Sequence, residues 1–82
     1  MRIVYFAWVR ERVGRAEEQL DPPRDVATVA DLVSWLRTRG PEYEHAFPAG
    51  VVRAAIDRRH VQPDAALAGA GEVAFFPPMT GG

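Results

Sequence analysis

The fold of this chain is decided by its closing stretch, Glu72-Val73-Ala74-Phe75-Phe76-Pro77-Pro78-Met79-Thr80-Gly81-Gly82. The β-branched and aromatic residues at its start predict a strand over residues 72–76, with Val73 and Phe75 pointing inward. Proline has no N–H to give to a sheet ladder and holds φ at about −65°, so Pro77 and Pro78 should end that strand and project a stiff arm. Six residues reach about 20 Å when extended. We therefore predict a folded domain over residues 1–76 and an extended tail over residues 77–82.

Two further strand pairs are expected upstream of this stretch. Residues 3–8 form a β-branched and aromatic run, and residues 16–20 are the expected antiparallel partner across a loop around Gly14. Residues 52–56 alternate between apolar and other side chains as a half-buried strand does. Asp57-Arg58-Arg59 is typical of a turn, and His60-Val61 would then form a short return strand.

One helix is expected between these pairs. Thr28 with Asp31 three residues later resembles a capping box in which Asp replaces Glu. Apolar residues then follow at i, i+3, i+4 and i+7, which places them on one face: Val29, Leu32, Val33 and Leu36. Gly40-Pro41 supplies a stop signal, and residues 41–50 are expected to hold a loop or a short turn of helix.

Together these elements predict an α+β fold with a mixed sheet of four or five strands crossed by one main helix. With the first and last strands central, this is the β-grasp arrangement of ubiquitin-like proteins. One helix covers only one face of a sheet, yet alternation along the strands puts Val4, Phe6, Trp8 and Phe76 on the other face. Apolar patches of that size tend to mark protein interfaces, so we expect a protein partner to bind there stably. A covering loop or a bulge that shifts the alternation is the alternative.

Composition narrows the classes of function. The 82 residues bound a single domain with a modest core, and 48% hydrophobic with 26% charged residues is typical of a folded protein. A net charge of −1 disfavours nucleic acid and anionic membrane as partners. No apolar run approaches about 18 residues and Met1-Arg2 leads directly into a strand, so we expect a cytoplasmic protein. Without cysteine or lysine, the chain offers no thiolate, no disulfide and no side-chain amine.

Several parts of the sequence resemble the MoaD family, the small sulfur-carrier subunits of molybdopterin synthase, over essentially the whole chain. The resemblance lies in Tyr5-Phe6-Ala7, Arg10-Glu11, Gly14, Thr28 to Leu32 and, above all, Gly71 to Gly82. The approach Phe-Pro-Pro, two residues and Gly-Gly is its specific part. The chain departs from the family at Asp57, where Asn is usual, and at Ala68-Gly69-Ala70-Gly71, which replaces an Asp-Gly-Asp turn. These departures concern turns only.

The resemblance implies that Gly82 is the reacting residue. An E1-like adenylating enzyme would use ATP to convert the Gly82 carboxylate to an acyl-adenylate, and a sulfur donor would then yield a thiocarboxylate, a tethered group carrier. A side chain at position 81 or 82 would crowd the passage, which explains Gly81 and Gly82. The catalytic groups should belong to the large synthase subunit, in a heterotetramer with this non-catalytic chain. No cofactor is expected on this chain itself. The expected subunit contacts are Phe6, His60, Phe76, Pro77, Pro78, Met79 and Thr80.

Other candidate chemistry is sparse. His45 and His60 lack ligand partners at metal-site spacing, so no metal is expected. Glu17-Glu18 and Glu42 with Glu44 are interpreted as solvated faces. Two alternatives remain open: a sulfur carrier for thiamine or cysteine synthesis, which would share the tail chemistry, and a ubiquitin-like interaction or modifier module.

Overall fold

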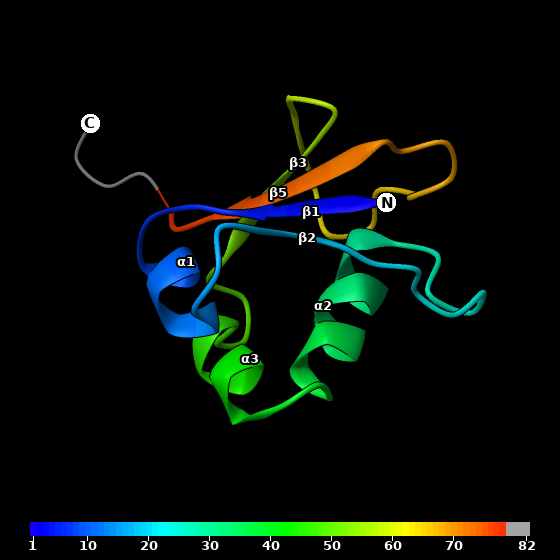
Figure 1. Cartoon of the computed structure of the whole chain (residues 1–82). Coiled ribbons are helices and arrows are strands. Elements are labelled where there is room, and N and C mark those ends of the chain that lie inside the picture. Colours follow the sequence, from blue (N-terminus) through cyan, green and yellow to red (C-terminus); the bar gives the residue numbers. More distant parts are fainter. Residues whose placement is uncertain (79–82) are drawn as a thin grey trace.

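The computed structural model describes residues 1–78 and shows a single mixed sheet with all its described helices on one side (Figure 1). The elements in chain order are β1 (Arg2–Tyr5), α1 (Ala7–Val13), β2 (Glu17–Gln19), α2 (Val29–Arg37), α3 (Pro41–Ala46), β3 (Arg53–Ile56), β4 (Arg59–Val61) and β5 (Glu72–Phe76). The strand order is β2-β1-β5-β3-β4. Only the β1–β5 pair is parallel. This is the predicted α+β β-grasp arrangement, with five strands.

Strand β5 lies at the centre of the sheet and has the predicted bounds. It pairs with β1 in the register Ile3↔Val73 and Tyr5↔Phe75, and these four side chains are buried. The strand ends at Phe76, immediately before Pro77, because proline cannot continue the ladder. The Phe75 ring packs edge-to-face on Phe47, with ring centroids 4.9 Å apart.

Helix α2 confirms the predicted capping box. The Asp31 N–H donates to Thr28 Oγ1 at 3.2 Å, while the N–H groups of Thr28 and Ala27 donate to Asp31 Oδ2 at 3.1 Å. These donors stabilise the carboxylate and lower the pKa of Asp31. Of the predicted apolar face, Val29, Leu32 and Leu36 are buried and Val33 is half-buried. The helix ends at Arg37, three residues before the predicted stop.

The predicted strand over residues 3–8 is too long, because the chain turns into helix α1 after Tyr5. Ala7 adopts φ of 51°, a left-handed conformation that breaks the strand. Gly14 is the helix C-cap with φ of 88°, and its N–H donates to Arg10 O. Trp8 therefore packs against the core from α1 rather than lying on the uncovered sheet face. The predicted antiparallel partner is confirmed, although a helix and not a simple loop connects it to β1.

Helix α3 lies in the stretch after α2, for which the sequence predicts either a loop or a short turn of helix. Pro41 occupies its first turn, where a missing N–H costs nothing. Tyr43, Ala46 and the following Phe47 are buried against the sheet. The described fold therefore has three helices on the sheet instead of one main helix (Figure 1).

The β3–β4 hairpin turns on Asp57 and Arg58, with φ of 46° and 70°. Two consecutive positive φ angles match the right-handed twist of a two-residue hairpin, and Asp tolerates this conformation. The predicted turn also included Arg59, which instead begins β4. The Asp57 carboxylate accepts hydrogen bonds from the N–H groups of Gly71 at 3.2 Å and Glu72 at 3.0 Å. This residue, a departure from the resembling family, ties the hairpin to the start of β5.

The interpretation of Glu18 as a solvated residue is wrong, since its side chain is only 4% exposed. Its Oε2 accepts hydrogen bonds from the hydroxyls of Tyr5 and Tyr43, both at 2.7 Å. Its Oε1 lies 3.1 Å from Arg15 and 3.7 Å from Arg39. Burial favours the neutral acid, but the two hydroxyls and the two guanidinium groups outweigh it and lower the pKa of Glu18. Burial and the adjacent carboxylate raise the pKa of Tyr5.

Candidate docking face and tail exit

The candidate site is the sheet face that no described helix covers. We call it the docking face and define it by Val4, Phe6, His60, Ala74 and Phe76, which line one shallow depression. The three predicted contact residues thus come together from three segments: Phe6 directly follows β1, His60 lies in the middle of β4, and Phe76 ends β5. Their part in binding another protein stays a prediction.

Phe6 is the one large hydrophobic residue among the described residues that is strongly exposed, at 50%. Its position is fixed by the main chain on both sides. The Phe6 N–H donates to Phe75 O at 3.0 Å, and its carbonyl accepts from Val9 N at 3.1 Å and Arg10 N at 3.3 Å. The left-handed Ala7 that follows costs about 1 kcal/mol of strain. Because the main chain at Phe6 is already fixed, only the freedom of its side chain is lost when a partner covers the ring.

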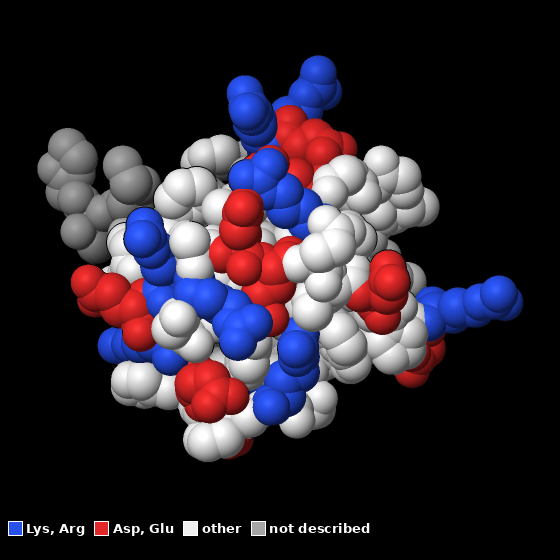
Figure 2. All heavy atoms as spheres, viewed as in Figure 1, with Lys and Arg blue, Asp and Glu red and all other residues white. Residues whose placement is uncertain are grey.

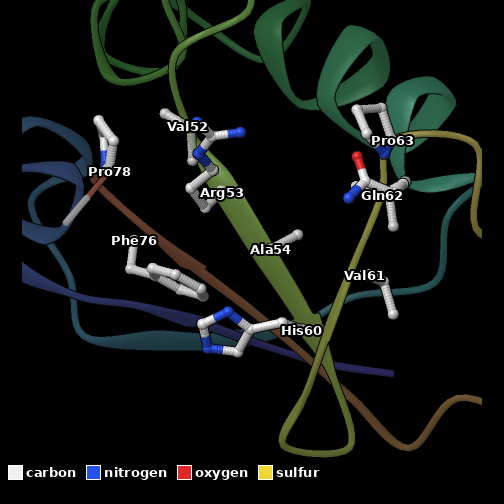
Figure 3. A pocket seen from close by; sticks show the side chains of 10 residues that line it. Val52, Arg53, Ala54, His60, Val61, Gln62, Pro63, Phe76 and Pro78 are labelled. Atoms are coloured by element: carbon white, nitrogen blue, oxygen red, sulfur yellow. The ribbon is translucent and has the colours of Figure 1, made fainter.

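Phe76 and His60 form the other side of the docking face. Their ring centroids lie 5.0 Å apart with a 50° angle between the planes, and Figure 3 shows the two rings turned toward one another. His60 is exposed and Phe76 is half-buried, so part of the aromatic surface remains open. Ala55, opposite His60 in the β3–β4 register, is buried beneath them.

The charges around the docking face are mixed. Arg2 pairs with Glu17 through contacts of 2.6 and 2.7 Å, both side chains being about half exposed. Arg58 and Glu72 also border the depression. Across the side of the molecule seen in Figure 2, acidic and basic side chains are likewise interspersed. Such a surface produces no extended field of one sign, consistent with the net charge of −1.

The tail leaves the sheet at the edge of the docking face. Pro77 and Pro78 are half-buried, and Pro78 lies beside a second, open groove of about 410 Å³ that shares His60 and Phe76 with the docking face (Figure 3). The groove is otherwise bordered by Val29 of α2, by Val52 just before β3, and by residues of β3, β4 and the loop after β4, among them Arg53 and Gln62. The predicted site residues Met79, Thr80, Gly81 and Gly82 lie outside the described residues.

Two features of this region were missed by the sequence reasoning. Ala7 gives no sign in the sequence of its left-handed conformation, although Gly14 and the spacing of Val9 and Val13 could have indicated helix α1. Arg53 and Gln62 line the same groove as Pro78 because the β3–β4 hairpin brings them there. No sequence motif predicts this arrangement.

The histidines and carboxylates of the described residues are dispersed rather than clustered. Residues 1–78 hold no group of three His, Cys, Asp or Glu side chains placed to bind an ion. His45 is exposed on α3 and its carbonyl accepts a hydrogen bond from Arg12. No helix within the described range is both long and apolar enough to cross a bilayer.

Comparisons with known proteins identify the family of the chain. The family model described as the ThiS family matches residues 3–82. The molybdopterin synthase sulfur carrier subunits of Escherichia coli and Haemophilus influenzae are 34% and 32% identical to this chain, over 100% of the chain and 99% of each relative. These matches confirm the family resemblance inferred from the sequence.

Solved structures agree as well. The crystal structure of SAMP1 from Haloferax volcanii has a TM-score of 0.74 at 25% identity, covering 100% of this chain and 98% of that one. A putative molybdopterin converting factor, subunit 1, from Pyrococcus furiosus has a TM-score of 0.73 at 28% identity, covering 95% of both chains. The family-model match over nearly the whole length of the chain, together with the β-grasp fold, shows that the chain belongs to the ThiS family.

Proposed function

We propose that this chain is the sulfur carrier subunit of a molybdopterin synthase. The observation that carries the proposal is the full-length match to two relatives that bear this name. The fold supports it, because the central strand β5 leads directly into Pro77-Pro78 and the Gly-Gly end of the chain. A tail attached to the central strand, which is paired on both sides, is presented from a rigid base.

The chemistry takes place at the Gly82 carboxylate. A carboxylate is a poor electrophile, so an E1-like adenylating enzyme first couples it to AMP with release of pyrophosphate from ATP. Sulfur supplied by a donor at the sulfide level then attacks the acyl carbon and displaces AMP, which takes the electron pair of the broken C–O bond, and the thiocarboxylate forms. The thiocarboxylate sulfur attacks a carbon of a cyclic pyranopterin phosphate, and an oxygen leaves that carbon with the electron pair of the broken C–O bond. Water then hydrolyses the bond between the acyl carbon and sulfur, which restores the Gly82 carboxylate and leaves the sulfur on the pterin. Two rounds complete the dithiolene, and this chain acts as the handle of the reactive group.

The docking face supplies the contact with the large synthase subunit. Phe6 and Phe76 are suited to act as aromatic anchors, and His60 lies against Phe76. Pro77, Pro78, Met79 and Thr80 would line the entry to the partner's active site, with Gly81 and Gly82 at its end. The acid, base and anion-binding groups belong to that subunit, and ATP is used by the adenylating enzyme. In this scheme the chain itself binds no cofactor.

Intact mass spectrometry tests the proposal. The chain is incubated with ATP, a sulfur donor and the adenylating enzyme of its own organism. Exchange of one oxygen for sulfur raises the mass by about 16 Da, and fragmentation places the change at Gly82. A matched variant that lacks Gly81 and Gly82 should keep its fold and remain unmodified. A mass change confined to an internal residue would contradict the carrier role.

A second experiment separates the two sulfur-carrier alternatives. If the thiocarboxylate forms but the large subunit cannot pass its sulfur to the pyranopterin, a carrier for thiamine or cysteine synthesis becomes the better description. A tight noncovalent complex with no change in the mass of the tail would instead favour an interaction module.

A further inference from the structure

The chain contains ten arginines and no lysine, so its only primary amine is the α-amine of Met1. This composition matters because an activated carboxyl group reacts with amines. The amine nitrogen attacks the acyl carbon, an amide bond forms, AMP or a thiol leaves with the electron pair, and the amine loses a proton to water. The guanidinium group stays protonated in proteins and has no free lone pair for this attack.

Arginine also stands at positions where a lysine would serve the same electrostatic purpose. Arg2 is an exception, because two nitrogens of its guanidinium group contact Glu17, which a lysine would not reproduce. Arg24 and Arg58 are exposed, and within residues 1–78 neither forms an ion pair or a cation–π contact. Packing and hydrogen bonding therefore do not require arginine at these positions.

The one amine is engaged in the fold. The Met1 amine donates to Leu20 O at 2.9 Å and lies 4.0 Å from Asp21 Oδ1, and the Leu20 N–H returns a hydrogen bond of 2.9 Å to Met1 O. These bonds extend the β1–β2 ladder by one residue pair, and the Met1 side chain is 14% exposed. Before it could attack an acyl carbon, the Met1 ammonium group would have to lose a proton and move out of these contacts.

The Met1 amine also lies at one end of the sheet, whereas the tail leaves the sheet at the other end. Because β1 and β5 run parallel with Arg2 opposite Glu72, Met1 is next to the start of β5. The tail leaves β5 at the opposite end, after Phe76, and Pro77-Pro78 opposes a reversal of the chain.

Hydroxyl groups are weak nucleophiles unless a base activates them. The hydroxyls of Tyr5 and Tyr43 donate to Glu18 inside the core, and that of Thr38 donates to Trp35 O. Within residues 1–78, no hydroxyl is hydrogen-bonded to a histidine side chain.

We propose that no side chain of this protein forms an amide with its own activated carboxyl group, and that any residual amide formation falls on the Met1 nitrogen. The inference rests on the proposed function, since it has a purpose only where Gly82 is activated. An activated carrier would then be consumed by its sulfur donor or by amines of other proteins, never by assembling into covalent chains of itself.

The test uses the full chain with a thioester installed chemically at Gly82, so that no partner enzyme is needed. The wild type and two variants, Arg24→Lys and Arg58→Lys, are incubated separately at high concentration. Denaturing gels and intact mass reveal any covalent dimer, whose mass is that of two chains less one water. We expect dimers joined through position 24 or 58 in the variants and no such product in the wild type. A trace of wild-type dimer joined only at Met1 agrees with the proposal.

A parallel tube with added free lysine controls for reactivity of the thioester in each chain. A wild type that dimerises as readily as the variants would overturn the proposal. So would variants that stay monomeric while their thioesters react with free lysine. Because the thioester is installed chemically, this result is independent of whether the chain serves molybdopterin synthase.

Discussion

Replacing Glu18 by Ala should cost about 3–5 kcal/mol of unfolding free energy, because it removes the acceptor of two buried hydroxyls. Tyr5 and Tyr43 both donate to the same oxygen at 2.7 Å, and each unpaired hydroxyl costs about 1–3 kcal/mol. Arg15 and Arg39 lose a partner as well, but both reach water and regain part of that energy. A domain of this size has a total stability of roughly 4–12 kcal/mol, so the variant should be close to unfolding.

Urea denaturation followed by the fluorescence of Trp8 and Trp35 measures this loss. The matched control is Glu17→Ala, one residue before Glu18. It removes an exposed ion pair with Arg2 and should cost at most about 1 kcal/mol of unfolding free energy. Glu18→Gln keeps the shape of the side chain and secures a folded variant for comparison. If Glu18→Ala and Glu17→Ala lose equal stability, the reasoning from burial is refuted.

The pH dependence of folding stability provides a second test of the role of Glu18. The pKa of Glu18 is lower in the folded chain than in the unfolded chain. Its charge therefore stabilises the fold above the ordinary carboxyl pKa, and this contribution disappears as the pH falls through the lowered value. The stability difference between wild type and Glu18→Gln should accordingly be largest near neutral pH and shrink in acid. A difference that stays constant down to strongly acidic pH would contradict the assigned pKa shift.

Three further predictions concern single contacts. Phe76→Ala should weaken binding to the large subunit by about 2 kcal/mol, roughly 30-fold in Kd by calorimetry, and an unchanged Kd would remove Phe76 from the interface. Thr28→Ala should destabilise α2 by about 1 kcal/mol in urea titrations, whereas Thr28→Ser should keep the cap, and equal losses would argue against it. Asp57→Ala should cost about 1–2 kcal/mol by loss of the acceptor for Gly71 and Glu72, while Asp57→Asn should stay close to wild type, and a neutral Asp57→Ala would contradict this role.

The elements that the sequence predicted best are those whose signals are local. Strand β5 is bounded by a β-branched and aromatic run and by Pro77, and α2 is marked by Thr28, Asp31 and apolar spacing. The pairing of β1 with β5 followed from recognising the β-grasp plan. On the site, alternation placed Phe6 and Phe76 on the uncovered face, although Phe6 lies one residue beyond the end of its strand.

The elements that were missed depend on contacts made far away along the chain. Helix α1 interrupts an apparently continuous strand because Ala7 is left-handed, and Gly14 is a helix C-cap rather than part of a hairpin loop. Glu18 resembles any exposed acid until Tyr43, 25 residues later, is brought to it by α3. Neither a buried ion cluster nor a strained residue has a local sequence signature.

The most direct test of the central claim is a single-turnover transfer of sulfur from this chain. The chain carrying a Gly82 thiocarboxylate is mixed with the large synthase subunit and cyclic pyranopterin, and both protein mass and pterin product are followed. The proposed function predicts that the chain loses about 16 Da as its carboxylate is restored, and that about two carriers are consumed for each dithiolene formed. A thiocarboxylate that persists in a stable complex with the large subunit, while the pterin gains no sulfur, would contradict it.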